Sequence, residues 1–309
     1  MVQEVLACLR PSAGETAVDC TLGGGGHAEA ILARLQPGGR LLGLDVDALE
    51  LPRTEARLRA AGYGPETFAA RHATFAALPE VLASEGVRAA DVVLVDLGVS
   101  TMQVENPARG FSYKVPGPLD MRLDPTIGEP ASALLATCQV DTLAALLEEH
   151  ADEPQASIIA ELLVQARPTT THAAERTIRL GLSRARPDLP AAEIKRSVRR
   201  TFQALRIAVN QEFAALDALL AALPGCLAPG GRVAILTFHS GEDRRVKKAF
   251  QAGRRAGVYA AVSGVVRSAK AETFANRRAA AAKLRWAVRG GIAEEGSRNL
   301  SAVDAPHQG

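Results

Sequence analysis

The sequence VDCTLGGGGHA, at residues 18–28, joins a predicted strand to a predicted helix through four consecutive glycines. Glycine has no Cβ, so the backbone of such a turn can approach a ligand closely and adopt left-handed conformations that other residues avoid. A glycine-rich turn between a strand and a helix is typical of nucleotide-binding α/β domains. The turn therefore predicts a nucleotide-like ligand at the carboxyl end of the first strand.

Short runs of leucine and β-branched residues alternate with helical patterns around this turn. The alternation predicts βαβ units, a parallel sheet and an α/β, Rossmann-like core. The run Val92 to Val95 is apolar without alternation, as expected of a central strand covered on both faces. The first predicted helix begins near His27. The predicted strands span residues 16–22, 40–45, 67–73, 91–97, 232–238, 261–267 and 283–288.

A change of pattern between Asn106 and Arg206 predicts an inserted helical domain. Strand-like runs disappear there, and amphipathic helical segments replace them at residues 141–150, 156–166 and 191–205. We therefore expect residues 1–105 to form the first part of the core, residues 106–206 the insertion, and residues 207–309 the second part of the core. The polar, unpatterned stretch from Gly290 onward predicts a flexible tail.

The composition is typical of a globular protein, with 309 residues of which 47% are hydrophobic and 23% charged. No apolar run has the length of a transmembrane helix, and the first residues lack the pattern of a signal peptide, so we expect a cytoplasmic protein without a membrane partner. The net charge of +2 leaves a nucleic-acid partner to be argued from the distribution of basic residues. The widely spaced cysteines indicate neither a zinc site nor a disulfide framework; they are Cys8, Cys20, Cys138 and Cys226.

The residues around the glycines favour one class of ligand. A P-loop requires Lys and Ser or Thr where this chain has His27 and Ala28, so nucleoside triphosphate binding is not expected. Asp45 ends the second predicted strand about 20 residues further on, the spacing at which a carboxylate meets ribose hydroxyls. Asp19 suits the cation of a sulfonium amino acid better than the pyrophosphate of NAD. This favours S-adenosylmethionine, although Asp19 could instead cap the turn through backbone amides.

Asp96 ends the fourth predicted strand, and its carboxylate is expected beside the glycine turn. Methyl transfer from a sulfonium needs positioning and relief of the positive charge that forms on the attacking nitrogen. Asp96 is therefore the candidate catalytic residue, with cofactor binding or strand termination as the alternative. Methylation at cytosine carbon five would need a cysteine nucleophile, and none lies near this strand end, so an exocyclic amine is the better target.

Five ordered blocks of sequence together resemble the MraW (RsmH) family of bacterial 16S ribosomal RNA cytosine-N4 methyltransferases. The blocks are DCTLGGGGHA at 19–28, DLGVSTMQVENPARGFSY at 96–113, GPLDMRLDP at 117–125, RTFQALRIAVNQE at 200–212 and PGGRVAILTFHSGEDRRVK at 229–247. The resemblance implies a Rossmann-like class I S-adenosylmethionine-dependent core with an inserted helical domain. It also implies that the partner is 16S ribosomal RNA in the small ribosomal subunit or its assembly intermediate. The cofactor positions that it implies are Gly25, Gly26, His27, Asp45, Phe75, Asp96 and Gln103.

Basic residues gather in two stretches, one late in the predicted insertion and one at residues 244–248, directly after FHSGED. Such clusters suit phosphate contacts, although a solvated helix face is the common alternative. Arg109 and Arg122 could orient RNA or could brace Asp120 and Asp124. The residues predicted to bind RNA are Arg109, Arg122, Arg196, Arg199, Arg200 and Arg244.

His239, Glu242 and Asp243 are spaced as a helix cap with surface charge, so no metal is expected there. Three rival functions stay open. They are an amino-methyltransferase of the same fold acting on DNA or protein, an NAD-dependent oxidoreductase, and a non-catalytic RNA-binding factor with a vestigial pocket.

Overall fold

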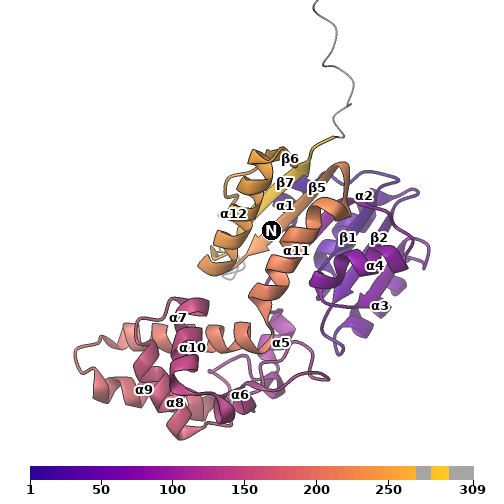
Figure 1. Cartoon of the computed structure of the whole chain (residues 1–309). Helices are drawn as coiled ribbons and strands as arrows, with labels where there is room; N and C mark the ends of the chain where they lie inside the picture. Colours follow the sequence, from indigo (N-terminus) through magenta and orange to yellow (C-terminus); the bar gives the residue numbers. More distant parts are fainter. Residues whose placement is uncertain (269–279, 292–309) are drawn as a thin grey trace, which may run out of the picture.

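The computed structural model describes residues 1–268 and 280–291 and contains a sheet with the strand order β3-β2-β1-β4-β5-β7-β6 (Figure 1). The predicted α/β fold class is confirmed, and each predicted strand overlaps an observed one. The strands are β1 Thr16–Asp19, β2 Arg40–Asp45, β3 Phe68–His72, β4 Ala90–Asp96, β5 Leu227–Thr237, β6 Tyr259–Val262 and β7 Lys283–Arg289. The strand predicted at 261–267 was placed too late. Tyr259 opens β6 because its ring is buried against Phe250.

The order of the strands creates one crevice in the sheet. Strand β1 pairs in parallel with β2 on one side and with β4 on the other, so the chain winds outward in both directions from β1 and β4. Strands β3 and β5 extend the parallel sheet, and β7 and β6 complete it in antiparallel pairing. Ligands of open α/β sheets lie at the carboxyl ends of the strands where the winding reverses. That point lies between Asp19, which ends β1, and Asp96, which ends β4.

Helices cover both faces of the sheet, and the side chains of each strand alternate between the two cores. Val93 and Val95 of β4 point into the core beneath one set of helices, whereas Val92 and Leu94 point into the other. The first face carries α4 Leu78–Ser84, α11 Glu212–Cys226 and α12 Ser240–Arg255. The second carries α1 Val2–Leu9, α2 Gly26–Leu35 and α3 Leu51–Ala60.

A group of helices between β4 and β5 packs around a third core, beside the sheet-containing part (Figure 1). They are α6 Ala131–Thr137, α7 Val140–Ala151, α8 Ala156–Ala166, α9 Thr171–Ala185 and α10 Ala191–Val209. Helix α10 has the strongest amphipathic pattern of this group, and its apolar face contributes Ile194, Phe202 and Leu205 to this core. Helix α11 then leaves the group and returns along the sheet. A short helix, α5 Thr101–Glu105, and the turn η2 Pro107–Arg109 lead from β4 into it.

Within residues 1–268 and 280–291, no single helix is long and apolar enough to cross a membrane, although α10 and α11 reach that threshold when counted together across a bend of 58°. The tail predicted from Gly290 onward lies outside the described residues from position 292 to 309.

Candidate functional site

A pocket of about 450 Å³ opens at the crevice between β1 and β4. This volume is within the usual range for small-molecule and cofactor sites. One end is formed by the glycine turn and the residues after β2. The other end is formed by side chains of residues that follow position 120 in the sequence. All seven residues predicted to bind the cofactor line it: Gly25, Gly26, His27, Asp45, Phe75, Asp96 and Gln103.

The glycine turn is held in shape by its neighbours. Asp45 accepts a hydrogen bond from the Gly23 amide at 2.6 Å, and Arg57 of α3 donates one to the Gly24 carbonyl at 2.7 Å. Gly25 has a φ of 74°, which places it in the left-handed region, and it caps the start of α2. Gly26 and His27, the first residues of α2, line the pocket, and a helix N-terminus favours anionic groups.

A buried network behind the pocket joins β2 to the chain that leaves β4. Asp47 is 1% exposed, and its Oδ2 accepts hydrogen bonds from Gln103 Nε2 at 2.8 Å and from Arg109 at 2.7 Å. The side-chain oxygen of Gln103, Oε1, accepts a hydrogen bond from the Ser100 amide at 2.8 Å. Each polar end of the Gln103 side chain thus makes one hydrogen bond within the protein. These bonds fix the side chain in the pocket wall and leave one N–H and one lone pair for a ligand.

Asp19 does not line the pocket, and only 1% of it is exposed. Its Oδ1 accepts from the Thr21 amide at 3.1 Å, so the structure supports the alternative in which Asp19 caps the turn. The contact with a ligand cation considered for Asp19 does not fit this burial. Burial raises the pKa of Asp19 to about 7, and the neighbouring carboxylates of Asp96 and Asp45 add to that rise.

Asp96 and His27 meet on the floor of the pocket. The Nδ1 atom of His27 lies 3.5 Å from Asp96 Oδ2, and the side chain of Asp96 is 31% exposed. Burial raises the pKa of Asp96 to about 7 and lowers that of His27 to about 4. Asp96 Oδ1 and His27 Nε2 are buried and have no hydrogen-bond partner among the described residues. Two polar atoms without partners in one pocket indicate a site built for a polar ligand.

A loop that precedes the helical group reaches the opposite end of the pocket. Its residue Met121 is buried and has a φ of 67°, which is an unusual backbone conformation for a residue other than glycine. Asn210, at the end of α10, holds the loop by donating to the Met121 carbonyl at 2.8 Å and accepting from the Leu123 amide at 2.7 Å. Leu123 is thereby placed in the pocket lining. The ends of the helical group thus shape this part of the site.

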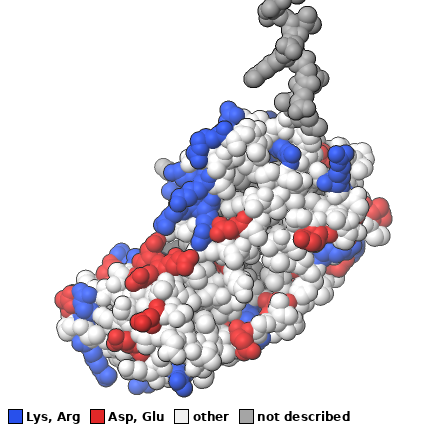
Figure 2. Space-filling view, viewed as in Figure 1, with Lys and Arg blue, Asp and Glu red and all other residues white. Residues whose placement is uncertain are grey.

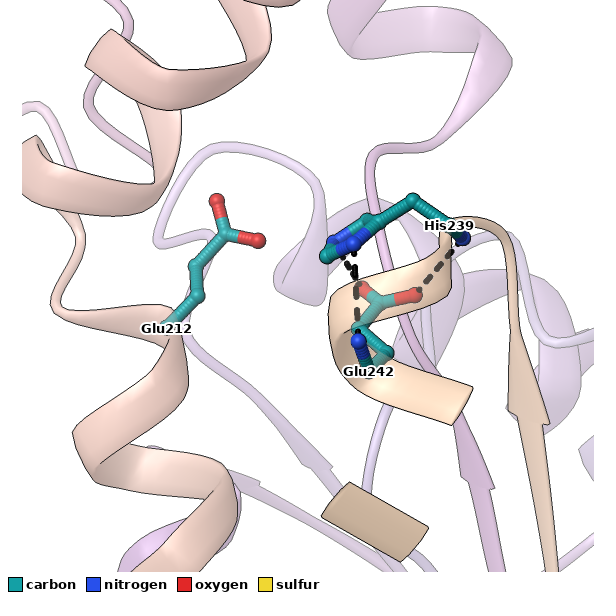
Figure 3. A group of neighbouring side chains, drawn as sticks. All are labelled: Glu212, His239 and Glu242. Atoms are coloured by element: carbon teal, nitrogen blue, oxygen red, sulfur yellow. Dashed lines mark hydrogen bonds and ion pairs between the residues drawn. The ribbon is translucent and has the colours of Figure 1, made fainter. Parts of the chain in front are cut away.

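Two carboxylates of the pocket lining and one histidine lie together: Glu212, Glu242 and His239 (Figure 3). Their ligand atoms lie within 4.8 Å of one another, a spacing that could suit a cation. Nδ1 of His239 lies 3.4 Å from the Glu242 amide, and its Nε2 lies 3.1 Å from a Glu242 carboxylate oxygen. The two residues thus form a capping box at the start of α12, as predicted for a helix cap. The absence of a metal from this cluster stays a prediction.

Two of the residues predicted to bind RNA are engaged by other groups of the protein, Arg109 in the interior and Arg122 at a partly exposed position. Arg109 is 5% exposed and donates to Asp47 and to the carbonyls of Arg122 and Leu123, so its predicted RNA contact does not fit the structure. Arg109 does hold a carboxylate in place, as the alternative prediction had it, but that carboxylate belongs to Asp47 rather than to Asp120 or Asp124. Arg122 does brace Asp120, with two nitrogens 2.9 and 2.7 Å from the two carboxylate oxygens.

The other predicted RNA residues are accessible. Arg196 and Arg199 are exposed on α10, and Arg196 pairs with Glu193 one turn away. Arg200 lies 3.9 Å from Glu153, and Arg244 of α12 lies 3.5 Å from Asp152. Since these two acids are adjacent in the chain, the structure brings Arg200 and Arg244 to the same junction between the helical group and the sheet.

Gly25 and Gly26 give a first test of the cofactor assignment. A Cβ on Gly25 would lie 2.8 Å from both Arg57 and Thr54, whereas one on Gly26 would meet nothing within 4 Å. Gly25→Ala should therefore destabilise the fold by about 1–3 kcal/mol, measured by urea denaturation. Gly26→Ala should leave stability within about 1 kcal/mol of the parent but weaken cofactor binding in calorimetry. Unchanged cofactor affinity in Gly26→Ala would contradict close approach of the ligand at this turn.

The comparisons with known proteins cover both the sheet and the helical group. A model of the MraW methylase family matches residues 1–289. The chain is 45% identical over 294 residues to Ribosomal RNA small subunit methyltransferase H 2 of Alkaliphilus metalliredigens, covering 93% of this chain and 84% of that protein. It is 42% identical over 299 residues to Ribosomal RNA small subunit methyltransferase H 1 of Agathobacter rectalis, covering 94% and 84%. The corresponding protein of Myxococcus xanthus is 45% identical over 252 residues, covering 82% and 78%.

Proposed function

The chain belongs to the MraW methylase family, and from this membership we propose that it methylates the exocyclic N4 of a cytidine in the decoding centre of 16S ribosomal RNA. The observation that supports this most directly is the convergence of Gly25, Asp45 and Asp96 on one pocket, together with relatives named as small-subunit ribosomal RNA methyltransferases. The protein is an enzyme, and its cofactor is S-adenosylmethionine.

The pocket suits the cofactor along its length. Asp45 retains lone pairs for ribose hydroxyls while it accepts the amides of Gly23 and Asp47. The amides at the start of α2 suit the carboxylate of an amino acid, and Phe75 offers an aromatic surface. The buried, unpartnered atoms of His27 and Asp96 mark where polar groups of ligand or substrate would complete the hydrogen bonding.

Asp96 is placed to act on the attacking amine. S-adenosylmethionine supplies an electrophilic methyl group when it is bound. As N4 acquires that methyl group it becomes positively charged, and a carboxylate at the floor of a partly dry pocket stabilises this charge and accepts a proton from it. His27 is neutral at physiological pH because burial keeps its pKa near 4, so it adds no competing positive charge beside Asp96.

The basic face of α12 is the proposed contact for RNA phosphates. Figure 2 shows Lys and Arg gathered over this helix, above a group of acidic side chains on the helical part. The basic residues of α12 are Arg244, Arg245, Lys247, Lys248, Arg254 and Arg255. We propose that RNA binds across this face toward Arg200, Arg199 and Arg196 of α10. The helical domain at residues 106–206 would then present the substrate to the core.

RNA affinity should fall steeply with salt. Single-stranded RNA loses roughly 0.7 in log affinity per log unit of salt for each neutralised phosphate. Lys247→Gln with Lys248→Gln should weaken binding and reduce this slope by about 1.4 if each lysine meets one phosphate. The measurement is a filter-binding titration at several salt concentrations. Lys114→Gln, which removes an exposed lysine outside both clusters, is the control, and a slope unchanged by the α12 changes would remove this surface from the proposal.

The direct test uses small ribosomal subunits from cells that lack this activity. The protein is incubated with labelled S-adenosylmethionine and the subunits, and the RNA is digested to nucleosides. N4-methylcytidine from the decoding region is the expected product. Label appearing only when DNA or protein is supplied would instead identify the rival amino-methyltransferase, and cofactor binding without transfer to any polymer would favour the non-catalytic RNA-binding factor.

A further inference from the structure

The end of the pocket opposite the glycine turn combines apolar side chains with two carboxylates. It is lined by Leu123, Glu212, Leu216, Phe238 and Glu242, which come from the loop before the helical group and from the chain after it. Both carboxylates have partners within the protein, Glu212 in Arg206 and Glu242 in two backbone amides, so each is held at a fixed place in the pocket lining.

Glu242 is fixed as an acceptor. It is 3% exposed at the start of α12, and its Oε2 accepts from the amides of Phe238 at 2.8 Å and His239 at 3.3 Å. Its other oxygen lies 3.1 Å from His239 Nε2. Because the backbone donors occupy one oxygen, the carboxylate cannot rotate freely. The second oxygen keeps lone pairs for a further donor.

Glu212 is fixed in the same way by a different partner. It begins α11, and both of its oxygens accept from Arg206, each at 2.7 Å. This two-bond contact holds the carboxylate plane rigidly. Its remaining lone pairs are not occupied by Arg206. Figure 3 shows the Glu242 carboxylate next to the His239 ring at the start of α12, with the Glu212 side chain of α11 pointing toward the same ring.

Glu242 stays ionised in this setting. Burial by itself would raise the pKa of Glu242, but the adjacent His239 ring and the nearby Arg206 lower it below its usual value. The helix N-terminus beneath it also favours negative charge. The Glu242 charge is felt by Asp96, whose pKa it raises further, so the two carboxyl groups belong to one electrostatic environment. They have opposite characters there, since Asp96 can hold a proton near neutral pH and Glu242 does not.

The walls between these carboxyl groups are apolar and partly aromatic. Phe238 directly follows β5 and lies against Gly98, where an added Cβ would come within 3.6 Å of the ring. Leu123 and Leu216 complete this lining. An aromatic or apolar wall with polar groups at its edge is how enzymes hold a base that has been taken out of a stack.

We propose that Glu242, assisted by Glu212, reads the exocyclic amine of the target base and selects cytosine over uracil. This inference rests on the proposed function. The amine of cytosine carries two hydrogens. One faces Asp96 as the nitrogen is methylated, and the other donates to a remaining lone pair on Oε1 of Glu242, the oxygen beside His239. Uracil presents a carbonyl oxygen at the same position, and an ionised carboxylate repels it.

Replacing each carboxylate by an amide tests the selection. Small subunits are reconstituted with 16S RNA that carries either C or U at the position the parent enzyme methylates. The affinities of both for enzyme saturated with S-adenosylhomocysteine are then measured. The parent should prefer C by about 10- to 100-fold. In Glu242→Gln the two backbone amides keep the amide oxygen, so the NH₂ faces the pocket, and the preference for C should fall to about threefold or less. Glu212→Gln should reduce the preference by a smaller factor.

The preference ratio separates reading of the base from a structural role, because a damaged fold weakens C and U subunits equally. Glu55→Gln, an exposed change on α3, is the matched control and should keep the parental ratio. If Glu242→Gln does not fold, Glu212→Gln decides the matter. Variants that bind cofactor normally and keep the full preference for C would overturn the inference. A parent enzyme that methylates no cytidine in any subunit would instead overturn the proposed function itself.

Discussion

Asp96→Asn should lower the turnover number by about 10²- to 10⁴-fold, the usual contribution of a positioned proton acceptor. The amide keeps the size of the side chain but cannot take a proton or stabilise positive charge on N4. Affinity for S-adenosylhomocysteine, which carries no sulfonium charge, should change by less than about tenfold, since one hydrogen bond at most is altered. Single-turnover methylation of small subunits measures the rate, and calorimetry measures the binding.

The dependence of the methylation rate on pH should also reveal the role of Asp96 as proton acceptor. The pKa of Asp96 in the ligand-free protein is raised to about 7, so its carboxyl group becomes protonated as the pH falls through that value. The parental rate should therefore decrease on the acid side, with the midpoint moved below 7 when the sulfonium cation is bound. Asp96→Asn should lose this limb of the profile.

Asp91→Asn is the matched control, because Asp91 lies near the opposite end of the same strand and only accepts the Thr16 amide, at 2.9 Å. It should retain turnover even if stability falls. An Asp96→Asn enzyme with parental turnover would remove Asp96 from the chemistry and leave it a cofactor or strand-end residue.

Asp47→Ala should destabilise the protein by about 3–5 kcal/mol, because it leaves the buried Arg109 guanidinium without its carboxylate. The same change removes the acceptor of Gln103 and of the amides of Leu49 and Glu50. Equilibrium denaturation in urea measures the free energy of unfolding. Cofactor affinity should fall as well, since the network forms the wall behind the pocket.

A surface ion pair provides the comparison. Arg179 is half exposed and pairs with Glu175 along α9, so Arg179→Ala should cost less than about 1 kcal/mol. The double variant Asp47→Ala with Arg109→Met should recover part of the loss, because no unpaired charge then remains in the interior. Equal costs for Asp47→Ala and Arg179→Ala would mean that the buried pair does not hold this region together.

The fold was predictable because its signals are local. The continuous apolar run of β4 and the glycine turn each identify an element without knowledge of the rest of the chain. Strand β6 was placed too late because Ala261 to Arg267 contains valines typical of strands. Burial of Tyr259 against α12, which no local pattern reveals, fixes the true start. Val266 pairs with Leu284 only through an isolated bridge.

The site was predictable only in part, for a related reason. Asp45 and Asp96 follow strands whose ends must meet, so topology alone brings them together. Arg109 was expected to face RNA, yet its partner Asp47 lies 62 residues earlier in the chain, and no spacing rule connects them. Glu212 and Glu242 begin two different helices, and each taken alone resembles an ordinary first-turn acid. Only the packing of α11 beside α12 reveals that they share a pocket.

The placement of the helical group between β4 and β5 also governs how the chain can fold. These strands pair along much of their length, yet β4 ends at Asp96 and β5 begins at Leu227. The entropy of closing a flexible loop grows by only about 0.6 kcal/mol per doubling of its length, but long-range pairing slows folding strongly. The helical group has its own core, and Asn210 clamps its exit against the loop at its entrance. If the helical group folds first, it holds the end of β4 and the start of β5 close together. These two strands can then pair without closing a long flexible loop, and the centre of the sheet forms last, around the pocket.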